Sequence, residues 1–305
     1  MAKIAVIGAG YVGLTTGACL AHLGHDVVVA DNNDDRVKSL KAGNIPFFEP
    51  GLDELVSDVV KSEKLSFALG ASKASENAEF HFLCLPTPAR TDGSSDLSYF
   101  EEGINEILSV LQPNSIVINK STVPLGTAKR LQEDMARTDV HIVSNPEFLS
   151  EGNAIRDFLE PSRIVIGANS REHSERVAKL YSKLNAPILM SSWESAELIK
   201  HTANAFLAMK LTFVNEIATL CEMTGADIKD VTDGIGYDPR IGSDYMNAGP
   251  GWGGSCFPKD SASLAQVARS FGFDFTLLEH TIDLNQKHLD RTAQKVQHLV
   301  PTGSP

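Results

Sequence analysis

Short apolar stretches alternate with amphipathic stretches over the first two hundred residues of the chain. The apolar stretches read "KIAVIG", "DVVVAD", "LSFAL", "EFHFLCL", "SIVINK", "VHIVS" and "SRIVIG". They are apolar nearly throughout, which is typical of strands that are buried on both faces. Strands that alternate with helices predict βαβ units. We therefore expect an α/β fold over residues 1–191, a doubly wound parallel sheet of the Rossmann type.

The hydrophobic pattern changes after this region. Residues 193–222, "WESAELIKHTANAFLAMKLTFVNEIATLCE", contain neither Pro nor Gly, and their apolar positions recur at helical spacing. This pattern predicts one long helix, too long for a crossover in a doubly wound sheet. Residues 274–299 predict a second long helix. We therefore expect residues 192–305 to form an all-α domain.

Composition limits the partners of the chain. It has 305 residues, and Asp and Glu outnumber Lys and Arg by 39 to 27, so that the net charge is −12. This charge repels nucleic acid, and no apolar run is long enough to cross a bilayer. The chain opens directly into a predicted strand, so we expect no secretory signal in it. Its four cysteines lie far apart without metal-ligand spacing, which favours a reducing cytoplasm and no metal site.

A dinucleotide-binding pattern follows the first predicted strand. Gly8, Gly10 and Gly13 form a G-x-G-x-x-G motif at the start of a helix, and Asp31 ends the next strand. The glycines permit a tight turn, a close approach of the pyrophosphate and close packing of helix and strand, while the acid binds the ribose 2′-OH. The pattern favours NAD over NADP. Arg36 lies close enough in sequence to bind a 2′-phosphate, so NADP stays an alternative.

Polar residues follow the later strands of the predicted sheet. Open parallel sheets bind ligands at the carboxyl ends of their strands, so we expect Thr87 and Thr122 to face the cofactor, unless they only form turns. Glu147 and Glu151 are four residues apart and would share a face if their segment were helical. Two neighbouring carboxylates suit a general base, and the alternative is a solvated helix surface.

The first long helix carries a second pair of polar residues. Lys200 and Asn204 are four residues apart and therefore share one face of the helix. A long helix beside a dinucleotide-binding domain is a common place for a lysine and an amide that bind substrate. The alternative, a solvated pair, is equally compatible with the spacing.

Cys256 lies in an unusual stretch, "AGPGWGGSCFPKD", in which four of the seven residues before it are glycine. Pro258 suits the first turn of a helix, so Cys256 should directly precede a helix N-terminus. There the helix dipole, with help from Lys259, would favour a thiolate. The alternative is a tight loop with an idle cysteine. The other cysteines lie in apolar patterns and are expected in the core: Cys19, Cys84 and Cys221.

A nicotinamide site and an activated thiol together indicate a reaction class. Oxidation of an alcohol to an aldehyde needs a hydride acceptor and a base. A thiolate becomes useful if the aldehyde is captured as a thiohemiacetal, oxidised again to a thioester and hydrolysed. The two features thus predict oxidation of an alcohol to an acid in two hydride steps.

Five motifs carry a resemblance to a known family. In chain order they are "GAGYVGL", "NPEFLSEGNAI", "ELIKHTANAFLAMKLTFVNE", "DPRIG" and "NAGPGWGGSCFPKD". With them the chain resembles the UDP-glucose/GDP-mannose dehydrogenase family. The resemblance implies oxidation of UDP-glucose at C6 to UDP-glucuronate, with two NAD reduced per turnover. Alternative substrates within the family are UDP-N-acetylmannosamine and GDP-mannose.

The resemblance also implies roles for residues. Cys256 would be the nucleophile, Lys200 would stabilise an oxyanion, Asn204 would bind substrate and water, and Glu151 would assist thioester hydrolysis as a base. Asp260 and Thr122 would position water or the reacting oxygen. Arg240 would reach into a neighbouring subunit's site. Contacts to substrate are implied for Glu147, Phe148, Leu149, Ser150, Glu151, Lys200, Asn204, Tyr245, Met246, Asn247, Ala248, Gly249 and Gly253, and contacts to NAD for Gly8, Gly10, Val12, Gly13, Asp31, Arg36, Thr87, Thr122, Glu151 and Lys259.

The family also implies an assembly and a further domain. Its members form homodimers through the long central helix, and they continue into a C-terminal UDP-binding domain. This chain stops at "HLVPTGSP", so we expect that domain to be absent from it. A rival interpretation is an NAD-binding dimer without full activity. Another is a 6-phosphogluconate-type or hydroxyacyl-CoA-type dehydrogenase, which has similar domains but needs no cysteine.

Overall fold

The computed structural model describes residues 1–91 and 93–299. The chain forms two compact units, one of Met1–Pro88 with Asp96–Lys200 and one of Ala89–Ser95 with His201–Pro305. The boundary between the two compact units therefore lies inside the long helix, between Lys200 and His201. The pattern of the sequence placed the domain boundary after residue 191. The domain limits 1–191 and 192–305 stay a prediction, and residues 300–305, where the chain stops, lie outside the described residues.

The first unit is built on one sheet of eight strands in the order β3-β2-β1-β4-β5-β6-β7-β8. Strands β1 to β6 pair in parallel, and the strand order reverses between β1 and β4. This reversal brings the loops after β1 and β4 to one edge, where doubly wound sheets bind ligands. The strands are β1 (Lys3–Ile7), β2 (Asp26–Asp31), β3 (Leu65–Leu69), β4 (Phe80–Leu83), β5 (Ile116–Asn119), β6 (His141–Ser144), β7 (Ile164–Gly167) and β8 (Ile188–Ser191).

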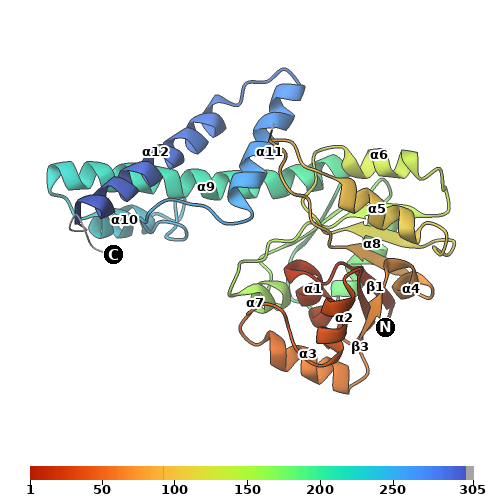
Figure 1. The fold of residues 1–305 in the computed structure, drawn as a ribbon. Helices are drawn as coiled ribbons and strands as arrows, with labels where there is room; N and C mark the ends of the chain where they lie inside the picture. The colour runs from red at the N-terminus through yellow and green to blue at the C-terminus, as the bar shows by residue number, and fades with distance from the viewer. Residues whose placement is uncertain (92, 300–305) are drawn as a thin grey trace. The chain divides into compact units, whose positions relative to one another are not determined.

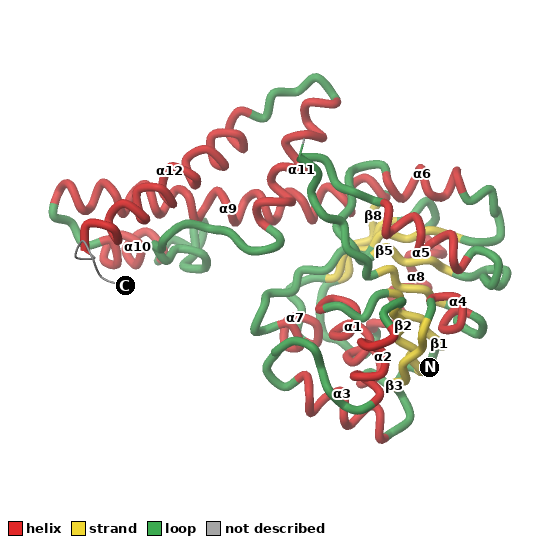
Figure 2. Tube along the Cα trace, in the orientation of Figure 1, coloured by secondary structure: helices red, strands yellow, loops and turns green. Residues whose placement is uncertain are grey.

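Helices cover both faces of this sheet, which is why its strands are apolar on both sides. One buried cluster joins one face to α1, α2, α3, α7 and α8, and a second joins the other face to α4, α5 and α6. The arrangement can be followed in Figures 1 and 2. The helices are α1 (Tyr11–His22), α2 (Asp34–Lys41), α3 (Leu52–Lys61), α4 (Ala71–Ser75), α5 (Ser98–Ile107), α6 (Thr127–Asp134), α7 (Ala154–Leu159) and α8 (Arg171–Ala178).

The second unit is helical, as the sequence pattern predicts. Helix α9 (Trp193–Thr224) enters it from the first unit, and α10 (Ile228–Gly236), α11 (Phe257–Ser270) and α12 (Thr276–Leu299) follow. Glu222 of α9 forms ion pairs with Arg291 and Lys295 of α12. Leu264 and Leu278 form a small buried cluster between α11 and α12. Both predicted long helices are confirmed, with ends within two residues of the prediction.

The sheet differs from the prediction at its last two strands. Strand β7 pairs with β6 in the antiparallel sense, through Ser144 and Gly167, so the sheet is mixed. The sequence pattern also missed β8, because this strand lies at the edge of the sheet. Its Leu189 is 50% exposed, and Pro187 precedes it. An edge strand buries little and leaves a weak hydrophobic signal.

Two further observations concern the described residues. Within them, no helix combines the length and the apolar character that crossing a membrane requires. The four cysteines are free thiols, and Cys19 and Cys221 are buried as expected, whereas Cys84 is only partly buried. Cys256 is exposed.

Candidate active site

The turn between β1 and α1 has the geometry of a dinucleotide site. A Cβ atom on Gly13 would lie 1.8 Å from the carbonyl oxygen of Gly8, and one on Gly8 would lie 2.4 Å from that of Cys84. These two glycines are therefore required by packing, and Gly8 also has a φ of +99°. Around Gly10, in contrast, nothing lies within 4 Å of the Cβ position. This open space beside the N-terminus of α1 fits a pyrophosphate.

Asp31 ends strand β2 next to this turn. Its carboxylate accepts hydrogen bonds from the backbone N–H groups of Ala9 and Asn33, each at 2.9 Å, and it is 8% exposed. Arg36 donates to the same carboxylate at 3.0 Å. An acid fixed at the end of the second strand fits the ribose of NAD. The charge of Arg36 is already paired with this acid, and an acid at the end of the second strand repels the 2′-phosphate of NADP.

The loops after β4 and β5 are bonded to each other. The hydroxyl of Thr87 donates to the carbonyl of Thr122 at 2.8 Å, and Ser121 exchanges hydrogen bonds with the backbone of Leu85. The two threonines that the sequence singled out therefore lie together at the carboxyl edge of the sheet. Their contacts with NAD stay a prediction.

The loop after β6 is not helical, so the suggested face shared by Glu147 and Glu151 does not exist. Residues 145–150 are irregular, and Glu151 opens a turn. Glu147 is instead buried, and its carboxylate lies 3.0 Å from the ammonium group of Lys200. Phe148 lies beside the same ammonium group, with its ring centroid 5.5 Å away. The interpretation of Lys200 as a solvated side chain is therefore wrong.

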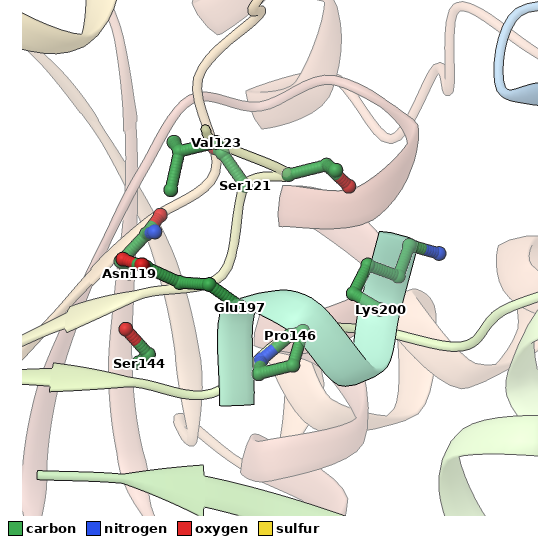
Figure 3. Close-up of a pocket in the computed structure, with 8 residues that line it drawn as sticks. Asn119, Ser121, Val123, Ser144, Pro146, Glu197 and Lys200 are labelled. Atoms are coloured by element: carbon green, nitrogen blue, oxygen red, sulfur yellow. The ribbon is translucent and has the colours of Figure 1, made fainter. Parts of the chain in front are cut away.

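Glu197 was missed by the sequence analysis. It is 4% exposed and accepts hydrogen bonds from the backbone N–H groups of Gly126 and Ala128, at 2.7 and 2.9 Å. Burial raises the pKa of its carboxyl to about 7. Figure 3 shows Glu197 reaching toward Asn119 and Lys200 pointing another way, both at the wall of one small pocket. Only the helical spacing from Lys200 could have drawn attention to Glu197.

A buried polar cluster lies behind the loop after β6 and was also missed. Lys120 is 5% exposed and donates to Asn145 at 3.3 Å, and the hydroxyl of Tyr181 donates to the same amide oxygen at 2.5 Å. Burial lowers the pKa of Lys120 to about 8. The cluster fixes Asn145, the residue from which the Glu147 loop starts.

Cys256 directly precedes α11 in the second unit, as predicted from Pro258. Its carbonyl accepts the backbone N–H of Asp260 at 2.8 Å, which closes the first helical turn. Asp260 is 1% exposed, and its carboxylate accepts a hydrogen bond from Asn204 at 2.6 Å and forms an ion pair with Lys259 at 2.8 Å. Asn204 is therefore buried and bonded, not solvated. The thiol is exposed at the end of a helix whose first turn is held by this cluster.

The glycine-rich loop before Cys256 is anchored at one residue. Trp252 is buried, its indole donates to Thr212, and its backbone exchanges two hydrogen bonds with Asn285. Next to it, a Cβ atom on Gly251 would lie 2.9 Å from Leu289, whereas nothing lies within 4 Å of the Cβ position of Gly253. The loop is thus held on one side of Trp252 and open on the side of the cysteine.

The remaining predicted residues of the second unit lie on its surface or in its loops. Arg240 is exposed and forms a bidentate ion pair with Asp238, in which the closest nitrogen–oxygen distance is 2.6 Å. Tyr245 has a φ of +61°, and Gly249 is held by the side chains of Asn215 and His288. Among the described residues there is no group of three or more side chains that could hold a metal ion.

Comparison with known proteins decides the family. Residues 2–185 match the NAD binding domain of the UDP-glucose/GDP-mannose dehydrogenase family, and residues 194–287 match its central domain. The chain belongs to this family. It is an NAD-dependent nucleotide-sugar dehydrogenase by membership, and NAD is its cofactor.

Individual relatives agree with the family. The chain is 45% identical to a UDP-glucose 6-dehydrogenase of Rhizobium meliloti over 304 residues, which cover 96% of this chain and 70% of that protein. A UDP-glucose dehydrogenase structure from Pyrobaculum islandicum superposes with a TM-score of 0.90 at 37% identity, over 94% of this chain and 68% of that one. A UDP-D-ManNAc dehydrogenase from Pyrococcus horikoshii gives 0.88 at 27% identity, over 97% and 71%.

Proposed function

We propose that this enzyme oxidises UDP-glucose at C6 to UDP-glucuronate through a covalent intermediate on Cys256. The observation that carries the proposal is the exposed thiol at the N-terminus of α11, next to glycines whose missing side chains leave the approach open. A thiolate gains stability from the unpaired N–H groups of a helix N-terminus. The reaction class follows because a thiol nucleophile is needed only if an aldehyde must be captured and oxidised again.

In the first stage the C6 hydroxyl is oxidised. Bound NAD supplies the hydride acceptor for this oxidation, and a second NAD does so for the next. Asp260 and Thr122 position a water, and the carboxylate of Asp260 accepts the hydroxyl proton through this water as the C6 hydride leaves. Asn204, whose amide is fixed by Asp260, binds the sugar and this water. The product of this stage is an aldehyde.

In the second stage Cys256 holds the aldehyde. The thiolate adds to the C6 carbonyl, and the oxyanion that forms is stabilised by the ammonium group of Lys200. Loss of the second hydride from C6 leaves a thioester. Glu151 then takes a proton from a water that attacks the thioester carbonyl, the carbon–sulfur bond breaks, and the acid and the Cys256 thiol are released. The buried position of Lys200 supports its role, because a cation acts more strongly away from solvent.

The test compares Cys256→Ala with Cys221→Ala, a buried cysteine of α9 that serves as control. With UDP-glucose and NAD, wild type and the control form NADH and UDP-glucuronate. Cys256→Ala forms no UDP-glucuronate, while calorimetry still shows NAD binding. UDP-glucuronate formation by Cys256→Ala contradicts the covalent mechanism. NAD binding without any turnover in the wild type favours the rival interpretation of an NAD-binding dimer.

UDP-N-acetylmannosamine is a second candidate substrate. The similarity to the UDP-D-ManNAc dehydrogenase of Pyrococcus horikoshii favours it, although the sequence identity of 27% is below the 45% shared with the Rhizobium meliloti enzyme. NADH formation measured side by side with UDP-glucose, UDP-N-acetylmannosamine and GDP-mannose separates the three. The highest kcat/KM identifies the substrate.

We also propose that the enzyme is a homodimer joined through α9, working in the cytoplasm. Phe206, Phe213 and Leu220 follow one another at intervals of seven residues and are 56, 55 and 53% exposed. Residues seven apart lie on one side of a helix, so they form an apolar stripe that a second copy would cover. Analytical ultracentrifugation of Phe213→Glu should show a monomer where wild type is a dimer. An unchanged mass would contradict this interface.

A further inference from the structure

Glu49 lies in the loop between α2 and α3, yet it is only 2% exposed. Its carboxylate accepts three hydrogen bonds: from the hydroxyl of Tyr11 at 2.6 Å and from the backbone N–H groups of Gly152 and Ala154, each at 2.8 Å. Tyr11 lies near the N-terminus of the chain, and Gly152 follows more than a hundred residues later. Glu49 therefore joins two segments through bonds to a single carboxylate.

One of these segments is the dinucleotide turn. Tyr11 is the first residue of α1 and follows Gly10, the glycine with open space around it. Its ring packs against Phe47, with 5.5 Å between the centroids. Burial, and next the hydrogen bond to Glu49, raise the pKa of Tyr11, so the phenol keeps its proton and acts as the donor.

The other segment carries Glu151, the proposed base of thioester hydrolysis. Glu151 and Gly152 form a turn in which Gly152 has a φ of +86°, and α7 begins at Ala154. The N–H groups at the start of a helix have no partner within the helix. Glu49 supplies the partner for Ala154 and also for Gly152, so it holds this turn from both sides of Asn153. The hydroxyl of Tyr11 lies 3.3 Å from the carbonyl of Ser150, which adds a fourth contact to the same link.

We infer that Glu49 is a positioning residue that fastens the turn carrying Glu151 to the dinucleotide turn, so that NAD binding orders the hydrolytic part of the site. The catalytic meaning of this link rests on the proposed function, because it depends on the role of Glu151. The coupling itself does not depend on that role. A ligand that rests on the N-terminus of α1 restrains Tyr11, and the restraint passes through one buried carboxylate to Gly152 and Ala154.

Amide hydrogen exchange tests the link without turnover. In the wild type, NAD should slow exchange in the segment 149–156. Glu49→Gln should speed exchange of this segment in the absence of NAD by about tenfold, since an amide cannot accept all of the bonds that a carboxylate accepts. Tyr11→Phe keeps both backbone bonds of Glu49 and removes only the link to α1. It should therefore leave exchange without NAD unchanged and abolish the slowing by NAD.

Glu54→Gln is the matched control, because Glu54 is exposed in the first turn of the neighbouring helix α3. It should behave as wild type in every measurement. Wild-type exchange in Glu49→Gln overturns the inference, and so does an undiminished effect of NAD in Tyr11→Phe. Calorimetry with NAD accompanies each variant, so that a lost effect of NAD is measured at saturation.

Kinetics separate this inference from the proposed function. For Glu49→Gln we expect kcat per NAD-binding site, counted by calorimetry, to fall about tenfold while the KM for NAD changes little, because the dinucleotide turn itself is intact. A merely structural defect would lower the number of NAD-binding sites and leave kcat per site unchanged. If the wild type makes no UDP-glucuronate but the exchange pattern is as described, the proposed function fails and the positioning by Glu49 stands. If the wild type makes UDP-glucuronate but the exchange pattern is absent, the proposed function stands and the positioning by Glu49 fails.

Discussion

The carboxylate of Glu147 and the ammonium group of Lys200 are 3.0 Å apart, and both side chains are almost fully buried. Removing one member of a buried ion pair leaves the other charge without compensation. We therefore expect Glu147→Gln to lower the free energy of unfolding by about 3 kcal/mol, measured by urea denaturation.

Two further variants show whether the charge is the cause. Glu147→Gln combined with Lys200→Met removes both charges and should recover part of the lost stability. Asp233→Asn breaks the exposed pair with Lys229 and should have little effect. A double variant less stable than Glu147→Gln would contradict the explanation by an uncompensated charge.

Two glycines of the dinucleotide turn should respond differently to the same substitution. Gly13→Ala places a Cβ atom 1.8 Å from the Gly8 carbonyl oxygen, so the turn must shift. We expect the free energy of unfolding to fall by about 2 kcal/mol and NAD binding to be lost as well. Gly10→Ala meets no protein atom within 4 Å, and its φ of −78° suits alanine. It should keep wild-type stability and still bind NAD at least about tenfold more weakly, because its methyl group occupies the space of the pyrophosphate. Thermal unfolding and calorimetry measure the two effects, and equal behaviour of both variants would contradict this division.

His81 should make the protein sensitive to acid. It lies in β4, and burial lowers the pKa of its imidazole to about 4. Between pH 4 and 6.5 the unfolded chain binds a proton that the folded chain does not, so the stability present above pH 6.5 is lost on acidification, by roughly 1.4 kcal/mol per pH unit. His81→Leu should remove this loss, whereas the exposed His22→Gln should not. The difference in unfolding free energy between variant and wild type, followed from pH 7 to 4.5, must grow if this is correct.

Glu197 should act in the opposite direction over a similar range. The folded chain keeps its proton up to about pH 7, while an unfolded glutamic acid loses it near pH 4.5. The folded chain thus binds more protons between these values, and the free energy of unfolding falls as the pH rises, by at most roughly 3 kcal/mol. Glu197→Gln should remove this fall, so that the effect of His81 becomes visible alone. The exposed Glu76→Gln is the control, and a pH dependence of Glu197→Gln identical to that of the wild type would be the contrary result.

The sequence by itself determined the features that are local in the chain. Apolar runs and helical spacing predicted seven of the strands and the long helices, because burial on both faces and amphipathic spacing leave periodic signals. The fingerprint of Gly8, Gly10, Gly13 and Asp31 predicted the dinucleotide turn, and Pro258 predicted that Cys256 precedes a helix. These signals depend on backbone geometry over a few residues, which is why they can be read without a fold.

Only the tertiary structure decided how distant polar residues are paired. It showed that Glu147 meets Lys200 and that the loop between Glu147 and Glu151 is not helical. Glu49 and Glu197 look like ordinary surface carboxylates in the sequence, yet each is buried because it binds backbone N–H groups of another segment. Such groups carry no periodic signal. A buried carboxylate is stable only where the fold brings unpaired donors to it, and that meeting exists only once the sheet and helices have assembled.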